Sequence, residues 1–271
     1  MPHLNPDHAP PRRIVVFGGV YNNHLSLAAT LAEAERRGAD EIYCLGDMGG
    51  FGPRPDKVFP LLQRAGVRCM QGNYDHSIGN RLEDCACGYT DPRDNHFARI
   101  SYDYTLARTS DANKDWLRAL PTGFRHTWNG RQVVMAHGST RRTNEFLWAS
   151  TSPDHFLEHL LRDAEADLLL VTHTGIPWSR TLPSGRTVIN VGAIGRPAND
   201  GNLNVWAVEI DLTTPSDIRH RFLPISYDHA ALADEMRDEQ LPEEFVATIL
   251  TGWWTTCLEI LPAKERALGR F

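Results

Sequence analysis

Residues 14–47 read IVVFGGVYNNHLSLAATLAEAERRGADEIYCLGD, and this segment determines which type of sheet the chain can form. An apolar run of strand length at 14–17 is followed by a helical pattern over 25–38 and by a second apolar run at 41–45. A helical pattern between two strand-length runs is typical of parallel strands joined by a helix. The segment therefore predicts a β-α-β unit.

The rest of the chain first extends this alternation and then becomes rich in strands. A hairpin turn is expected at Asn129-Gly130, between two strands within 127–136. Further helices are expected over 55–66 and 153–166, and further strands at 67–70, 168–171, 186–191, 204–212 and 218–225. A β-α-β first half with a strand-rich second half predicts an α/β fold, in which two packed sheets lie between helices.

The chain is expected to form one main domain with two appendages. Residues 1–11 are rich in Pro, His and Asn, so we expect a flexible N-terminal lead. The domain itself is expected over 12–226. Residues 227–271 are helical in pattern, and a segment of roughly 40 residues is marginal for burying a core of its own. We therefore expect a helical C-terminal extension packed on the core, and a homodimer formed through it is the alternative role for this segment.

The composition excludes several classes of protein. With 28 basic and 34 acidic residues, the formal net charge is −6, so no excess positive charge is available for non-specific binding of nucleic acid. Five cysteines are too few for a disulfide framework in 271 residues, which favours a reducing compartment. No apolar run approaches the roughly 18 residues of a membrane span, and the N-terminus has no apolar secretion signal. We expect a cytoplasmic protein that binds neither nucleic acid nor membrane.

Four polar side chains follow four separate strands: Asp47, Asn73, His137 and His173. In open α/β sheets ligands bind outside the carboxyl ends of the strands, so we expect these side chains to converge. Singly, each could be a helix cap or a hydrogen-bonded core histidine, but four such groups are costly to bury without a shared partner. One carboxylate, one amide oxygen and two imidazoles suit Mn, Fe or Zn better than Ca or Mg. The pattern predicts a divalent transition metal as cofactor.

Five sequence blocks also carry a resemblance to a known family. They are LGDMGGFGPRPDKV at 45–58, MQGNYD at 70–75, VVMAHGS at 133–139, VTHTGIP at 171–177 and TVINVGAIGRPAND at 187–200. In their order and separations, over about residues 13–211, they resemble the calcineurin-like metallophosphoesterases, especially the small bacterial phosphodiesterase-like branch. The resemblance implies a four-layer αββα sandwich of the metallo-dependent phosphatase type. It also implies metal-dependent hydrolysis of a small phosphoester.

The chain departs from the family pattern in one half of the dimetal site. The resemblance aligns Gly19 and Tyr21 with the first Asp and His ligands of the family, and Gly175 with its last His ligand. The other half-site, which the resemblance aligns with Asp47, Asn73, His137 and His173, is complete. Tyr74 takes the place of the family's catalytic histidine. Because the losses fall on one metal, the resemblance implies one conventional ion or a second ion held differently, that is, one or two ions per chain.

Four residues are candidate additional metal ligands: Tyr21, His24, Cys85 and Cys87. A phenolate suits ferric iron, and thiolates select Zn, Cu(I) or iron over Mg. The alternative for Tyr21 is a packed aromatic residue whose hydroxyl finds a hydrogen bond. The alternative for the two cysteines is a pair of reduced thiols in a loop.

Other residues are candidates for the reaction itself. Tyr74 and Tyr21 could transfer a proton, and Asp75 is grouped with them, either in catalysis or in orienting a ligand. Protein cations must neutralise the phosphoryl charge that a single ion leaves. The candidate substrate-binding residues for this role are Arg141, Arg142 and Arg196, and the alternative for each is a solvated surface residue.

The sequence leaves three functions open. The first is a hydrolase of a small phosphoester, either a diester or a specialised organic phosphate. The second keeps the fold and one metal, or an iron centre, but performs redox or lyase chemistry. The third is a non-catalytic protein that binds or senses a ligand. The first function predicts turnover of a phosphoester. The second predicts a tyrosinate or thiolate charge-transfer absorption, and the third predicts ligand binding without turnover.

Overall fold

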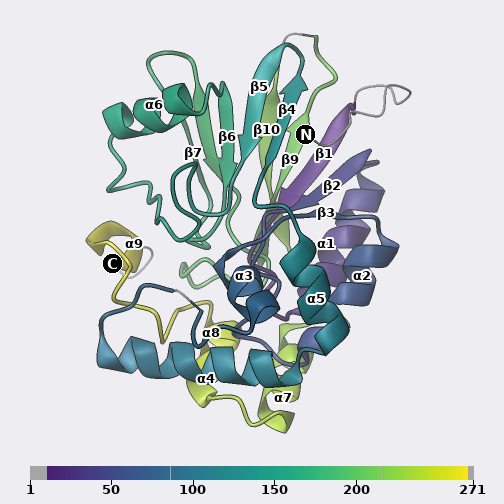
Figure 1. The fold of residues 1–271 in the computed structure, drawn as a ribbon, viewed down its shortest axis with the longest axis vertical. Coiled ribbons are helices and arrows are strands. Elements are labelled where there is room, and N and C mark those ends of the chain that lie inside the picture. The colour runs from purple at the N-terminus through teal and green to yellow at the C-terminus, as the bar shows by residue number, and fades with distance from the viewer. Residues whose placement is uncertain (1–10, 86, 216, 268–271) are drawn as a thin grey trace.

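The computed structural model describes residues 11–85, 87–215 and 217–267, which form two five-stranded mixed sheets with helices on both outer sides (Figure 1). The first sheet has the order β10-β9-β1-β2-β3, and the second has the order β4-β5-β6-β8-β7. The strands of the first sheet are β1 (Arg13–Phe17), β2 (Glu41–Cys44), β3 (Arg68–Cys69), β9 (Val205–Asp211) and β10 (Arg219–Ile225). The strands of the second are β4 (Phe124–Trp128), β5 (Arg131–Met135), β6 (Leu168–Val171), β7 (Trp178–Thr181) and β8 (Thr187–Asn190).

The predicted β-α-β unit is confirmed. Strand β1 pairs in parallel with β2, and β2 pairs in parallel with β3. Helix α1 (His24–Arg36) makes the first connection, and the 3-10 helix η1 (Pro55–Lys57) and α2 (Phe59–Arg64) lie in the second. The helix expected over 55–66 is therefore divided. Pro60 is tolerated in the first turn of α2, because the N–H that proline lacks has no partner there within a helix.

Alternate residues of β1 face two different layers. Ile14 and Val16 belong to the apolar core between the two sheets, whereas Val15 and Phe17 pack with residues of α1 and α2. On the other side of the second sheet, α6 (Asp154–Asp163) packs on β6 and β8. Since side chains alternate across a strand, this gives the order helix, sheet, sheet, helix. The four-layer αββα sandwich is confirmed.

Three helices between β3 and β4 were not expected from the sequence: α3 (Asn73–Asn80), α4 (Pro92–Arg108) and α5 (Asp111–Ala119). Strand β7 was not expected either. For α4 the sequence pattern explains the omission, because this helix has no apolar stripe with a helical period. Its buried residues are Asp94, Phe97, Ser101, Tyr102 and Thr105.

The predicted C-terminal extension is helical and comprises α7 (His229–Asp238), α8 (Glu243–Thr251) and α9 (Ala263–Ala267). Residues of α7 and α8 pack in one apolar cluster with Tyr21, Phe51 and Phe97 from earlier parts of the chain. The extension therefore covers the end of the first sheet that carries the loops after β1 and β2 (Figure 1). The expected domain limits near 11 and 226 remain predictions, and residues 1–10 and 268–271 lie outside the described residues. Over the described ranges, no helix is both long and apolar enough to cross a membrane.

Candidate metal centre

The structure brings the four predicted ligands together from both sheets. Asp47 follows β2, Asn73 begins α3 directly after β3, His137 follows β5 and His173 follows β6. Asp47 and His173 adopt left-handed backbone conformations, with φ of 57° and 46°. Such conformations are uncommon for residues with a side chain and recur at functional sites. Sharp turns at the strand ends thus aim these side chains at a common point.

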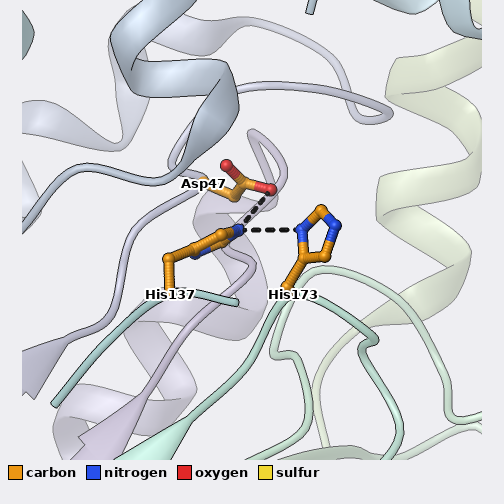
Figure 2. A group of neighbouring side chains, drawn as sticks. All are labelled: Asp47, His137 and His173. Carbon is orange, nitrogen blue, oxygen red and sulfur yellow. Dashed lines mark hydrogen bonds and ion pairs between the residues drawn. The ribbon is translucent and has the colours of Figure 1, made fainter. Parts of the chain in front are cut away.

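Three of the side chains form a buried triad (Figure 2). The Oδ2 atom of Asp47 lies 3.2 Å from Nε2 of His137, and the same Nε2 lies 3.1 Å from Nδ1 of His173. One oxygen or nitrogen ligand atom from each residue lies within 4.8 Å of the other two. This spacing suits a single cation held between them, because metal–oxygen and metal–nitrogen bonds are about 2.0–2.2 Å long.

The backbone fixes which nitrogen of His137 faces the site. Nδ1 of His137 lies 2.7 Å from the carbonyl oxygen of Leu45. A carbonyl can only accept a hydrogen bond, so Nδ1 carries a proton, and in the neutral ring Nε2 has the lone pair. Nε2 is therefore the nitrogen available to a metal, and it lies against Asp47 and His173.

Asn73 is the fourth predicted ligand. Its Nδ2 donates a hydrogen bond of 2.8 Å to the carbonyl oxygen of Cys85, which fixes the orientation of the amide. Its Oδ1 is buried and has no hydrogen-bond partner among the described residues, and Asn73 lines the same cavity as Asp47 and His173. A buried acceptor without a partner is costly and calls for an explanation. A cation bound by this oxygen supplies one, so the donor set fits a transition metal.

The triad favours a positive charge beside Asp47, which a proton on His137 supplies in the metal-free protein and a bound cation would replace. Burial opposes charge on Asp47 and His137, but their attraction for each other lowers the pKa of the Asp47 carboxyl and raises the pKa of His137. Burial, together with the neighbouring His137, lowers the pKa of His173 to about 3. His173 is therefore a neutral imidazole near pH 7, which is the form that binds metals.

Asp75 does not line the cavity and acts through Asp47 instead. Its carboxylate accepts hydrogen bonds from the backbone N–H groups of Asp47 at 2.6 Å, Met48 at 2.9 Å and Gly72 at 2.8 Å. Burial and the nearby Asp47 carboxylate raise the pKa of Asp75 to about 7. These bonds hold the loop that carries Asp47, which supports the alternative that Asp75 orients a ligand, and a catalytic role for Asp75 remains a prediction.

Tyr21 and Tyr74 both line the cavity. The backbone N–H of Tyr74 donates to Oδ1 of Asp47 at 3.0 Å, and its hydroxyl donates to Oγ of Ser101 at 3.1 Å. Burial raises the pKa of both phenols above the ordinary value. Each is therefore a neutral hydroxyl near pH 7 in the metal-free protein.

Three candidate additional ligands are placed differently from the expectation. His24 begins α1 and lies 3.6 Å from the carboxylate of Glu235 and 3.3 Å from Lys57, outside the cavity. Cys85 and Cys87 form a disulfide with each other. Their sulfurs are then not thiolates, which corrects both the expected metal ligation and the alternative of two reduced thiols. Cys87 nevertheless lines the cavity wall beside Asn73.

Two of the three candidate arginines lie outside the cavity. Arg141 and Arg142 are exposed, and Arg141 forms an ion pair with Glu145. The loop after His137 closes on itself, with the N–H of Ser139 donating to the carbonyl of Arg142 at 3.0 Å. This turn directs both arginines toward solvent, so the expected substrate contacts are corrected. Arg196, by contrast, is buried and lines the cavity.

Several cavity residues were not identified from the sequence. The structure adds aromatic and apolar walls from the 88–98 region and from the C-terminal extension: Tyr89, Phe97, Phe245, Cys257 and Ile260. Phe146, which follows the His137 block and for which the sequence allowed either a pocket wall or ordinary core packing, also lines the cavity, with its ring centroid 4.4 Å from that of His173. The apolar pattern of α8 indicates a buried face, but nothing in it indicates that the face adjoins a metal site. The extension, expected to serve for packing or dimerisation, contributes to the site.

Known proteins share this architecture. A family model, described as the calcineurin-like phosphoesterase superfamily domain, matches residues 13–212. An uncharacterised protein from Methanocaldococcus jannaschii is 22% identical over 244 residues, which cover 85% of this chain and 94% of the relative. The crystal structure of a metallophosphoesterase from Sphaerobacter thermophilus has a TM-score of 0.69 at 24% identity and covers 89% of this chain and 99% of its own. The crystal structure of a hypothetical protein from Pyrococcus horikoshii OT3 has a TM-score of 0.71 at 20% identity and covers 90% of this chain and 99% of its own.

The family match includes every structural part of the candidate site except the C-terminal walls. It extends from β1 to the end of β9 and contains all four converging side chains. The similar solved structures share the fold over nearly their whole length. The chain belongs to the calcineurin-like phosphoesterase superfamily.

Proposed function

We propose that this protein is a metal-dependent hydrolase of a small phosphoester and that it works with one divalent transition metal. Asp47, Asn73, His137 and His173 would hold the ion. The observation that carries the proposal is the unpartnered Oδ1 of Asn73, which lines one cavity with Asp47 and His173 in a chain of this superfamily.

Each part of the cavity has a role in the proposed reaction. When bound, the ion supplies Lewis-acid charge at a phosphoryl oxygen. Arg196 binds the remaining phosphoryl charge. A water molecule would attack phosphorus as the bond to the leaving oxygen breaks. Tyr74, at the position of the family's catalytic histidine, would give its hydroxyl proton to the leaving oxygen and regain a proton released by the attacking water, and Tyr21 would support the phosphoryl group. Asp75 holds the Asp47 loop in place.

The walls of the cavity favour an organic group on phosphorus. Phe51, Phe97, Phe146 and Phe245 line the same cavity as the metal ligands. Aromatic walls bind apolar or aromatic groups and exclude water. We therefore propose a phosphodiester or an organic phosphate of small size as substrate, with Mn, Fe or Zn as the metal. A cytoplasmic location and a homodimer through the extension remain part of the proposal, as does the absence of nucleic-acid and membrane partners.

Metal analysis and turnover test the proposal together. The purified protein, reconstituted with Mn, Fe(II) or Zn, is expected to hydrolyse bis(p-nitrophenyl) phosphate or p-nitrophenyl phosphate. His137→Ala and Asn73→Ala should lose both the ion and the activity. Tyr74→Phe should keep the ion and lower kcat by about 100-fold or more. Arg142→Gln, which changes an exposed arginine outside the cavity, serves as the matched control.

Three results would contradict the proposal. Binding of the ion without turnover of any phosphoester would favour a ligand-binding protein. A coloured protein with a charge-transfer band and redox turnover would favour an iron centre. Retention of the metal in Asn73→Ala and His137→Ala would show that the ion binds elsewhere.

A further inference from the structure

The chain cannot hold a second metal ion in the manner of the family's dimetal site. Gly19, Tyr21 and Gly175 occupy the three positions that the family resemblance aligns with ligands, and they offer no carboxylate or imidazole. A Cβ atom at Gly19 would lie 2.8 Å from Cζ of Tyr21 and 2.8 Å from Cβ of Ala193. The tyrosine ring therefore takes the space that a longer side chain at position 19 would need.

An arginine lies beside these altered positions. The guanidinium carbon of Arg196 is 5.6 Å from the ring centroid of Tyr21 and 3.6 Å from that of Trp254. Trp254 in turn lies within 3.6 Å of a Cβ built at Gly175. The cationic group thus sits among the residues that have replaced the ligands of the second ion, in the cavity that Asp47, Asn73 and His173 also line.

The charge of Arg196 is stabilised without being neutralised. Only 7% of the residue is exposed, and no carboxylate in the described part of the chain forms an ion pair with it. Its neighbours are instead the rings of Tyr21, Phe51 and Trp254, together with the side chain of Cys257. Aromatic faces attract a cation but carry no net charge. The site therefore retains a buried positive charge, which is costly unless an anion binds.

The guanidinium also has an N–H donor available to a ligand. The Nε atom of Arg196 is buried and has no hydrogen-bond partner within the part of the chain that the structure describes. Trp254 is held firmly in place beneath it, because its Nε1 donates to the carbonyl of Pro197 at 2.7 Å and its backbone N–H donates to Oδ1 of Asn199 at 2.9 Å. A planar, fixed guanidinium matches the geometry of phosphate oxygens.

We propose that Arg196, positioned by Trp254, replaces the second metal ion and forms an anion subsite for the phosphoryl group. The identification of that anion as part of a phosphoester rests on the proposed function. The subsite explains why the C-terminal extension covers this end of the sheets: the extension supplies the ring on which the guanidinium lies. Trp254 is a positioning residue, whereas Arg196 contacts the substrate.

Titration of the full-length, metal-free protein with inorganic phosphate tests the subsite alone. Wild type should bind phosphate saturably by calorimetry, and Arg196→Gln should weaken the affinity by about 10–100-fold. Arg196→Lys, which keeps the charge but not the fork of donors, should fall between them. Arg142→Gln is the matched control and should bind as wild type does. Trp254→Phe, with a smaller ring, should weaken phosphate binding severalfold while circular dichroism shows a folded protein.

The outcomes separate this inference from the proposed function. Absence of phosphate binding by the metal-free wild type, or equal binding by Arg196→Gln, would overturn the subsite even if the metal-loaded protein hydrolyses phosphoesters. Phosphate binding that depends on Arg196 in a protein without turnover would support the subsite and contradict the proposed hydrolase. One ion per chain at saturating Mn supports the replacement of the second metal, and two tightly bound ions would overturn it. If Arg196→Gln does not fold, three measurements still test the subsite: phosphate binding by the wild type, phosphate binding by Arg196→Lys, and the number of ions bound per chain.

Discussion

The carboxylate of Asp75 accepts a hydrogen bond of 2.6 Å from the backbone N–H of Asp47. Asp47 is a candidate metal ligand with a left-handed backbone, so a residue that does not line the cavity controls the orientation of one that does. Asp75 also accepts the N–H groups of Met48 and Gly72. One carboxylate thereby joins the loop after β2 to the beginning of α3.

Asp75→Asn is expected to weaken both the fold and the metal site. An amide has one acceptor oxygen and places an NH₂ group against a backbone N–H, so at least one buried donor loses its partner. We expect the free energy of unfolding to fall by about 2–4 kcal/mol and metal affinity by about 10–100-fold. Urea denaturation and metal titration measure the two effects. Asp103→Asn, in a half-exposed ion pair with Arg99, should change stability by less than about 1 kcal/mol.

Gly72→Ala is expected to weaken metal binding through steric conflict. A Cβ atom at this position would lie 2.2 Å from Oδ1 of Asp47 and 2.7 Å from Cε1 of His137. The backbone cannot retreat easily, because the N–H of Gly72 is bound to Asp75. We expect metal affinity to fall by at least about tenfold, measured by competition with a chromogenic chelator. Gly66→Ala, where no atom lies within 4 Å but φ is +62°, should cost about 1 kcal/mol of stability with unchanged metal affinity.

The stability of the metal-free protein is expected to fall in acid partly through His126. Burial, together with the nearby Arg68, lowers the pKa of His126 below its ordinary value of 6.5, so the folded state favours the neutral ring. Its contribution is complete above pH 6.5 and is lost as the pH falls through the lowered pKa. His126→Phe keeps a ring beside Trp128 and should flatten this part of the pH profile. The free energy of unfolding is measured by urea denaturation at each pH. If His126→Phe loses as much stability below pH 6.5 as the wild type does, His126 is not a source of the acid sensitivity.

The cysteines are expected to titrate as three free thiols and one disulfide. Cys44, Cys69 and Cys257 are free, whereas Cys85 and Cys87 are paired. Protein denatured without reductant should react with three equivalents of a thiol reagent, and with five after reduction. Cys85→Ser/Cys87→Ser should give three under both conditions. Five equivalents without reductant would show that the pair is reduced in the protein as isolated.

The parts of the site that could be predicted are those tied to strand ends. Asp47, Asn73, His137 and His173 each follow a strand directly, and the carboxyl ends of neighbouring strands meet at one edge of the fold. Arg141 and Arg142 show the limit of this reasoning. They lie close to His137 along the chain, but the turn at Ser139 directs them toward solvent.

The helices of the 73–119 segment show a second limit. Helix α4 buries Asp94, Ser101 and Thr105 along with its aromatic residues, so its sequence lacks the apolar period by which a buried helical face is predicted. The polar groups are satisfied by distant partners, as when Asp94 accepts the N–H of Cys257 at 2.7 Å. Partners of this kind exist only in the folded chain.

The sequence alone determined the β-α-β framework and the set of four candidate ligands, because apolar periodicity and strand ends are local properties of the chain. Only the tertiary structure decided that Arg196 stacks on Trp254 in the same cavity. That contact joins the loop after β8 to the C-terminal extension. It depends on how distant segments pack, since Trp254 lies in one apolar cluster with Trp148 and Ile176, rather than on any pattern within either segment.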